Sequence, residues 1–503
     1  MAGKLALKSP SLETIELATR HPLPPSVSTF NFSTFGEDGD EEVRTRTETA
    51  LASDQSENEN GNRNESSLAP VDRGFGVWSF LTGAFLVEAI VWGFPNAFGV
   101  FLNAYLEDPN WSSQPNARSL LPLIGTLSSG IIYCSGPVIY PITTRYPYIR
   151  RIFMWCGTLM CCASLFGASY ATTVKELVVL QGVMYAIGGS LLYSPCLSYL
   201  SEWFVARRGL ANGVIFAGTA LGGLLLPLLL PPLLHAYGPA KSLRILAIST
   251  LIALLPILPF IRGRLPEVRT RVVATSRRRE GWMWDKMWWI LIVANTVQGF
   301  GYFVPIIWLP TFASELKISD SGSALTISLL NGASVVGRLS LGFLSDKIDP
   351  WLLALTTLLS SSLATFLLWG VFSHSLGGLL AFGIAYGCLA GGWSSLYTSF
   401  IRPIAKDDPA LCTSLLGILM FFRGLGNVLS TPISTSLSSI HTTTNVGYNS
   451  SYGDAGHMDK MGFDVAGGKY EKMILYCGSC FAGAAGIALF GWSVERSKSG
   501  AGR

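Results

Sequence analysis

The chain has 503 residues, of which 49% are hydrophobic and 14% are charged, and its formal net charge is +4. A soluble protein carries about 25% charged residues, so this composition indicates a membrane protein. The small net charge excludes an extended basic surface for nucleic acid. The sequence also lacks a Walker loop, a His-Glu-x-x-His motif and zinc-type spacing of its cysteines, so we expect no enzymatic activity, no metal and no cofactor.

The first 72 residues differ in composition from the rest of the chain. They are rich in Ser, Thr, Asn, Asp and Glu, and residues 37–42 form an acidic run. Such a segment cannot bury enough apolar surface to offset the entropy that it loses on ordering. It also lacks the continuous apolar core of a signal peptide. We therefore expect residues 1–72 to be a disordered cytoplasmic tail.

Twelve apolar segments follow, and each is long enough to cross a hydrocarbon core, which takes roughly 20 helical residues. A basic loop separates the first six from the last six, an arrangement typical of transporters built from repeats. The expected spans are 77–105, 119–140, 152–170, 176–202, 209–233, 241–261, 286–313, 322–344, 351–372, 376–400, 411–435 and 472–493. We predict an all-α membrane protein with an N-terminal six-helix half (73–261), a basic cytoplasmic linker (262–285), a C-terminal six-helix half (286–495) and a short cytoplasmic tail (496–503).

Basic residues concentrate in alternate loops, and such loops face the cytoplasm. Arg207 and Arg208 lie in one of them, and the linker carries seven more arginines. Both termini are therefore predicted to be cytoplasmic. The protein itself is expected in the plasma membrane, with the vacuolar or another internal membrane as the alternative. The glycosylation candidates Asn110 and Asn449 then fall in external loops. The second of these loops, residues 436–471, is rich in Gly, Ser and Thr and is expected to be unstructured.

The fifth span carries glycines at spacings of about four residues. Small residues at this spacing let helix backbones approach closely in lipid. We therefore expect Gly213, Gly218 and Gly222 to provide tight, movable helix packing. Arg207 and Arg208, just before them, are interpreted as residues that fix the topology and contact lipid headgroups.

Three motifs resemble one known family. The chain contains Tyr185-x-x-Gly188-Gly189 followed by Pro195, then Trp203-Phe204-x-x-Arg207-Arg208-Gly209-Leu210-Ala211-x-Gly213, and also Asp72-Arg73-Gly74-Phe75-Gly76-Val77-Trp78 and Gly337-Arg338-Leu339-Ser340-x-Gly342-x-Leu344-Ser345-Asp346. Together they resemble the monocarboxylate-transporter-like members of the major facilitator superfamily, and the fungal branch most closely. The resemblance covers residues 72–495. It implies a twelve-helix carrier of the major facilitator fold that moves an organic anion or another small solute, often with protons.

The chain departs from that family at two positions. The family commonly has a lysine after the Phe-Pro step of helix one, where this chain has Asn96. It also places an aspartate one turn before the arginine of helix eight, where Ser334 precedes Arg338. Both departures remove residues of the family's usual proton and anion site, and Glu88 is a candidate for the missing carboxylate.

Charged residues inside a span cost roughly 2.5–3.5 kcal/mol on insertion scales, so they are functional candidates. Glu88, Arg338 and Arg423 are such residues. The alternatives are structural. Arg338 would brace a loop against Asp346, Arg423 would bond backbone carbonyls in a broken helix near Gly424, and Glu88 would be a packed acid held neutral by burial. By resemblance, Tyr302 and Trp393 are candidate cavity walls, and Asn96 completes the candidate binding set.

These observations predict a secondary active transporter of a small organic solute, with a monocarboxylate or related anion as the expected substrate and protons as the candidate coupling ion. The first alternative is an exporter of a secondary metabolite or toxin. The second, from another functional class, is a membrane nutrient sensor that does not transport. The expected partners are the solute, protons and the lipid bilayer, with no nucleic acid.

Overall fold

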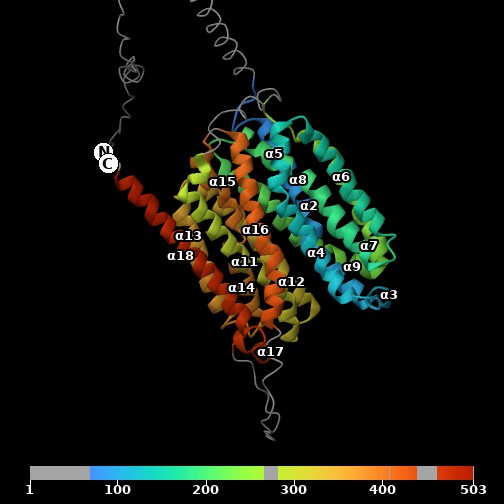
Figure 1. The fold of residues 1–503 in the computed structure, drawn as a ribbon. Coiled ribbons are helices and arrows are strands. Elements are labelled where there is room, and N and C mark those ends of the chain that lie inside the picture. Colours follow the sequence, from blue (N-terminus) through green and yellow to red (C-terminus); the bar gives the residue numbers. More distant parts are fainter. Residues whose placement is uncertain (1–67, 266–280, 407, 439–460, 502–503) are drawn as a thin grey trace, which may run out of the picture. The chain divides into compact units, whose positions relative to one another are not determined.

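The computed structural model describes residues 68–265, 281–406, 408–438 and 461–501. The expected tail therefore lies almost wholly outside the described residues, as do most of the linker and Asn449. The regular elements of the described part are all helical (Figure 1). They are α2 (Phe75–Glu107), α3 (Pro109–Ser112), α4 (Ala117–Cys134), α5 (Gly136–Arg145), α6 (Ile149–Ala168), α7 (Val174–Leu177), η3 (Val178–Met184), α8 (Tyr185–Trp203), α9 (Arg208–Ile257), η4 (Leu258–Phe260), η5 (Gly281–Trp284), α11 (Lys286–Glu315), α12 (Asp320–Ser345), α13 (Pro350–Leu363), η6 (Ala364–Trp369), α14 (Leu376–Ala390), η7 (Trp393–Leu396), α15 (Tyr397–Ala405), α16 (Pro409–Ser438), η9 (Gly462–Asp464), α17 (Val465–Gly468) and α18 (Glu471–Ala501).

Eleven continuous helical stretches within the described residues are long and apolar enough to cross a membrane. One of them, which includes α9, contains two spans, because Gly238 inside it has φ 73° and ψ 171°. Glycine adopts such a conformation at no steric cost, and it turns the chain between residues 233 and 241, where we expect the loop between spans five and six. Ten single spans and this double one are consistent with the twelve that the sequence predicts.

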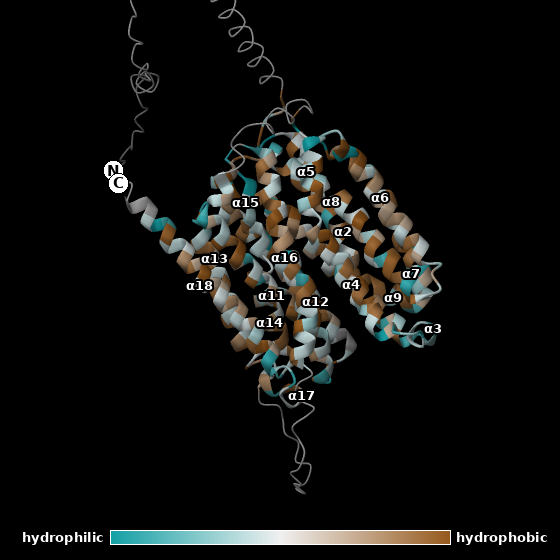
Figure 2. Ribbon diagram, viewed as in Figure 1, coloured by the Kyte–Doolittle hydropathy of each residue, from teal (hydrophilic) through white to brown (hydrophobic). Residues whose placement is uncertain are grey.

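Both ends of the described chain lie toward the same end of the helical bundle. In Figure 1, α2 begins and α18 ends at the same end of the helical bundle, as an even number of spans requires. Figure 2 shows apolar residues along the lengths of the helices and hydrophilic residues concentrated at their ends and in the connections. This distribution is expected for helices that expose their middle portions to lipid.

We call α2–α9 the N-terminal helices and α11–α18 the C-terminal helices. α9 packs extensively against both α2 and α12, and α16 packs against α4, α5 and α11. Gly213 of α9 makes the contact with α12 possible, because a side chain there would run into the carbonyl of Arg338 and the Cα of Gly342. Gly218 and Gly222 instead face α2. These two glycines therefore hold helices within the N-terminal set, whereas Gly213 lies between the two sets.

The end of the last long loop is ordered, contrary to our expectation. Residues 462–468 form the short helices η9 and α17. The N–H of Phe463 donates to the carbonyl of Gly370 at 2.8 Å, and the N–H of Gly462 donates to that of Val371 at 3.3 Å. The Gly- and Ser-rich composition concealed this segment because its order comes from backbone bonds to the end of a distant helix.

Candidate substrate site

A small cavity lies between the N-terminal and C-terminal helices. The centre of a water molecule can occupy only about 10 Å³ of it. Typical ligand pockets measure about 300–1,000 Å³, so this conformation is too contracted to hold a drug-sized solute. The cavity brings together the three charged residues that the sequence places inside spans. Its lining residues are Glu88, Trp92, Tyr133, Phe216, Thr219, Arg338, Ser394, Met420 and Arg423.

Glu88 of α2 is 1% exposed. Its Oε1 accepts a hydrogen bond from the Thr219 hydroxyl of α9 at 2.9 Å, and its Oε2 has no partner in the described part of the chain. Asn96, two turns further along α2, donates from Nδ2 to the Thr219 carbonyl at 3.2 Å. Both side chains therefore join α2 to α9, but only Glu88 lines the cavity.

Arg338 of α12 spans the boundary between the two sets of helices. Its Nε donates to the Ser334 hydroxyl at 3.1 Å, and its Nη1 donates to the carbonyl of Phe216 in α9. Ser334 therefore still contacts the arginine from the position of the family's aspartate. Arg338 does not brace a loop against Asp346, so that alternative is wrong. The Asp346 carboxylate instead accepts from the N–H groups of residues 209 and 210, at 2.8 and 2.9 Å, and so caps the start of α9.

Arg423 of α16 is 1% exposed and has no carboxylate within ion-pair distance among the described residues. Its Nη1 donates to Gln298 Oε1 at 2.7 Å, and the guanidinium carbon lies 4.2 Å from the ring centroid of Tyr302. The hydroxyls of Tyr133 and Tyr397 lie beside it. Side chains, and not backbone carbonyls near Gly424, hold this arginine, so the backbone partners expected for it are wrong.

Trp393 is not among the residues that line this cavity, and its indole belongs to a polar network. Its Nε1 donates to Asn295 Oδ1 at 2.9 Å, and the Tyr397 hydroxyl donates to the same oxygen at 2.6 Å. Asn295 Nδ2 in turn donates to the carbonyl of Leu419 at 2.9 Å. This network ties η7 to α11 and α16. Tyr302, by contrast, reaches the site through its ring, which lies beneath the Arg423 guanidinium.

Two polar groups of the site were not predicted from the sequence. Trp92 lines the cavity, and its buried Nε1 has no partner within the described residues. Helical periodicity could have identified it, because it follows Glu88 by four residues and so lies on the same face of α2. Gln298 is the other, and its Nε2 is likewise buried without a partner in the described chain. A polar residue in an apolar span was the available signal for it.

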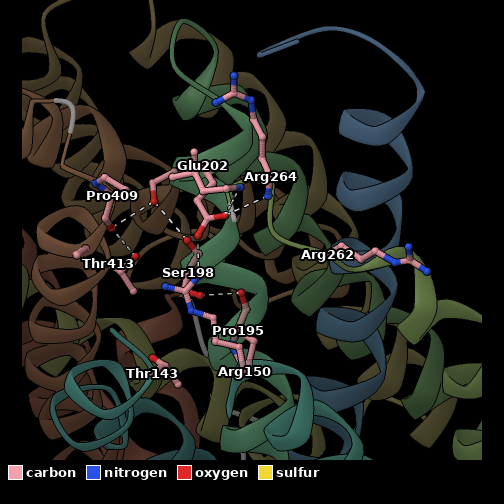
Figure 3. Close-up of polar contacts among 12 residues, drawn as sticks. Thr143, Arg150, Pro195, Ser198, Glu202, Arg262, Arg264, Pro409 and Thr413 are labelled. Carbon is pink, nitrogen blue, oxygen red and sulfur yellow. Dashed lines mark hydrogen bonds and ion pairs between the residues drawn. The ribbon is translucent and has the colours of Figure 1, made fainter. Parts of the chain in front are cut away.

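A second polar cluster lies at the end of the bundle where α8 meets α9 (Figure 3). Arg150 of α6 and Glu202 of α8 form a buried ion pair, with Nη1 and Oε1 2.6 Å apart. Glu202 Oε2 also accepts from the N–H groups of Arg264 and Leu265, at 3.1 and 3.3 Å. Arg150 lies at the start of α6, and the structure makes it a partner of a carboxylate 52 residues away.

Arg207 and Arg208 differ in their surroundings. Arg207 is exposed, as a headgroup contact requires. Arg208 is only 4% exposed, so the headgroup interpretation of this residue is wrong. Its Nε donates to the carbonyl of Phe204 at 2.7 Å, and its Nη1 donates to that of Lys406 at 3.1 Å. The second bond joins the N-terminal helices to the C-terminal helices.

Two of the sequence motifs contact each other. The Asp72 carboxylate accepts hydrogen bonds from the N–H groups of three consecutive residues in the turn between α8 and α9, which are Val205, Ala206 and Arg207. A carboxylate binds such free donors strongly because the bonds are charge-assisted.

The glycosylation candidate Asn110 lies in α3. Its side chain is exposed, and its Nδ2 donates to Asp108 Oδ1 at 2.9 Å.

Comparison with known proteins identifies a family. The family model described as the Major Facilitator Superfamily matches residues 81–431. MFS-type transporter pytF of Aspergillus terreus is 29% identical over 284 residues, covering 56% of this chain and 94% of that protein. The Fujikurins efflux protein of Gibberella fujikuroi is 28% identical over 348 residues, covering 67% of this chain and 72% of that protein. The structure of a proton:xylose symporter, named XylE, with a bound bromodeoxyglucose has a TM-score of 0.60 at 16% identity, covering 83% of this chain and 95% of that one.

Proposed function

Because the chain belongs to the Major Facilitator Superfamily and is a membrane transporter of that fold, we propose that it exports an acidic secondary metabolite across the plasma membrane. The observation that carries the proposal is Arg423, whose guanidinium is buried beside the cavity with no carboxylate within ion-pair distance in the described chain. Leaving a buried charge unpaired costs several kcal/mol. An anionic solute would supply the missing charge.

The surroundings of Arg423 support a solute that is apolar as well as acidic. A guanidinium grips a carboxylate or another planar anion through two parallel hydrogen bonds. Trp92, Tyr133 and Phe216 supply aromatic walls next to it, and the Trp92 N–H is a free donor. An efflux protein among the relatives favours export over uptake. The motifs of residues 185–227 favour a second candidate, a small monocarboxylate carried by a member of the monocarboxylate-transporter-like branch.

Glu88 is the proposed proton carrier. It is the only carboxylate in the cavity lining, and its Oε2 has no partner among the described residues. A buried carboxylate that can gain or lose a proton as the solute binds would couple transport to the proton gradient. We further propose that the N-terminal and C-terminal helices move as two bodies about this cavity, as in other carriers built from repeats.

Loss of the gene in its native host provides the test. Mass spectrometry of cells and medium should show that an acidic metabolite accumulates in the deletion strain and leaves wild-type cells. Reintroduced wild-type protein should restore its release, and Arg423→Gln should not. Arg151→Gln is the matched control, because this arginine is exposed at the start of α6. An anion site at Arg423 would be refuted if the deletion strain accumulated only a neutral metabolite. It would also be refuted if Arg423→Gln restored release as well as the wild-type protein does.

A further inference from the structure

A second small cavity lies between α8 and α9 on one side and α15 and α16 on the other. In this closed conformation the centre of a water molecule can occupy about 10 Å³ of it, and it shares no lining residue with the central cavity. By the distribution of basic residues, this is the cytoplasmic end of the bundle. Its lining residues are Leu197, Leu200, Ser201, Arg208, Thr398, Cys412, Thr413 and Leu416.

The cavity contains a buried cation without a counter-ion. Arg208 is 4% exposed, and its hydrogen bonds go to two neutral backbone carbonyls. No carboxylate in the described residues lies within ion-pair distance of it. The nearby Asp408 accepts instead from the N–H groups of Ala410 and Leu411, where it caps α16.

An unsatisfied hydroxyl faces the same space. Thr398 of α15 is 1% exposed, lines the cavity, and its Oγ1 has no partner in the described part of the chain. Two further hydroxyls, those of Ser201 and Thr413, both donate to the carbonyl of Pro409, at 3.3 and 2.8 Å (Figure 3). The cavity therefore combines one guanidinium with three hydroxyl groups, a set suited to the oxygens of an acidic group.

Two of these groups also hold the cytoplasmic end closed. Arg208 bonds Lys406 and Ser201 bonds Pro409, and both bonds join N-terminal to C-terminal helices. Loading from the cytoplasm requires these helices to separate. Separation breaks both bonds, so the Arg208 and Ser201 donors become free at the moment when solute can enter.

We propose that Arg208, with Ser201, Thr398 and Thr413, forms a second anion-binding subsite that takes the acidic group of the exported solute during loading, before it reaches Arg423. This inference rests on the proposed export of an acid. It assigns Arg208 two successive partners, which are the Lys406 carbonyl in the closed state and the solute in the open state.

A ligand role and a purely structural role predict opposite changes. If Arg208 only holds the closed state, its loss favours the open state and lowers the half-saturating concentration on the cytoplasmic face. If Arg208 binds the solute, its loss raises that concentration. Asn212 is the matched control, since its Nδ2 joins the two sets of helices through the Ser394 carbonyl at 2.9 Å and it lines neither cavity.

The experiment measures transport of 2-naphthoate, a fluorescent apolar carboxylate, in everted vesicles and in intact cells, with neutral 2-naphthylmethanol as the comparison. Arg208→Gln should raise the half-saturating concentration of 2-naphthoate on the cytoplasmic face by about tenfold or more, the loss expected for a charge-assisted hydrogen bond. The value on the external face should not change. Arg208→Lys should show a smaller increase, because it keeps the charge and loses the planar fork. Asn212→Ala should lower the cytoplasmic value.

Three results would count against these ideas in different ways. A fall in the cytoplasmic value for Arg208→Gln, matching Asn212→Ala, would make Arg208 a structural latch and overturn the subsite. Equal changes on both faces would also overturn it, while leaving the proposed function intact if Arg423→Gln still abolishes selectivity for naphthoate. A wild-type protein that does not prefer 2-naphthoate to 2-naphthylmethanol would refute the anion chemistry of both sites.

Discussion

Replacing Gly218 by alanine tests the closest approach between α2 and α9. A Cβ at this position would overlap the carbonyl oxygen of Phe85 and lie 3.0 Å from the Cβ of Glu88. Carbon atoms in contact are ordinarily about 3.5–4.0 Å apart, so the two helices must separate by about 0.5–1 Å. The bond between Glu88 and Thr219, now 2.9 Å, would then lengthen to the limit of a hydrogen bond.

The cost of this overpacking is about 1–3 kcal/mol. Gly99→Ala is the matched control, because Gly99 lies in α2 and nothing lies within 4 Å of a Cβ there. Both variants gain about 1 kcal/mol of helix propensity, so the difference between them isolates the packing cost. At roughly 2–4 °C per kcal/mol for domains of 150–250 residues, we expect thermal unfolding of purified Gly218→Ala to fall several degrees below that of Gly99→Ala.

The same variant should transport poorly once its abundance in the membrane has been equalised, because the separation displaces Glu88 from Thr219. Gly218→Leu and Gly222→Leu should have larger effects of the same kind. If Gly218→Ala and Gly99→Ala unfold at the same temperature and transport equally, the close packing of α2 on α9 is not what holds Glu88 in place.

Three further predictions follow from the site and the ends of the bundle. Glu88→Gln keeps the shape of the side chain and removes its proton exchange, so solute gradients driven by pH should vanish while exchange of solute for solute remains; a parental response to external pH would make Glu88 a structural acid. Asp346→Asn removes the charge with which the end of α12 caps α9, an interaction worth about 0.3–2 kcal/mol at a helix N-terminus. The N-terminal and C-terminal helices should then separate more often at this end, so Thr413→Cys should react faster with a thiol reagent from the cytoplasm in this variant than in the parent. In a cysteine-free background, an impermeant reagent should label Asn110→Cys and not Tyr148→Cys in intact cells, since both positions are exposed and the basic loops predict opposite sides; the reverse pattern would invert the topology.

The sequence was sufficient for the spans and for the presence of charges inside them. Hydropathy is a local property, and a helix in lipid satisfies its backbone internally, so each span can be recognised without its neighbours. Even the turn at Gly238 follows from the gap between two apolar runs. The cost of an intramembrane charge likewise singles out Glu88, Arg338 and Arg423 without reference to any partner, and all three line one cavity.

Partner choice was decided only by the tertiary structure. Arg338 bonds Phe216, 122 residues away, whereas the nearer Asp346 caps another helix. The loop position of Arg208 suggested exposure, and so the residue was wrongly interpreted as a headgroup contact. Its guanidinium in fact donates to the carbonyl of Lys406, which lies 198 residues along the chain. A buried polar group must find a hydrogen-bond partner wherever the packing brings one, and helical periodicity gives the face of a side chain without saying what that face meets.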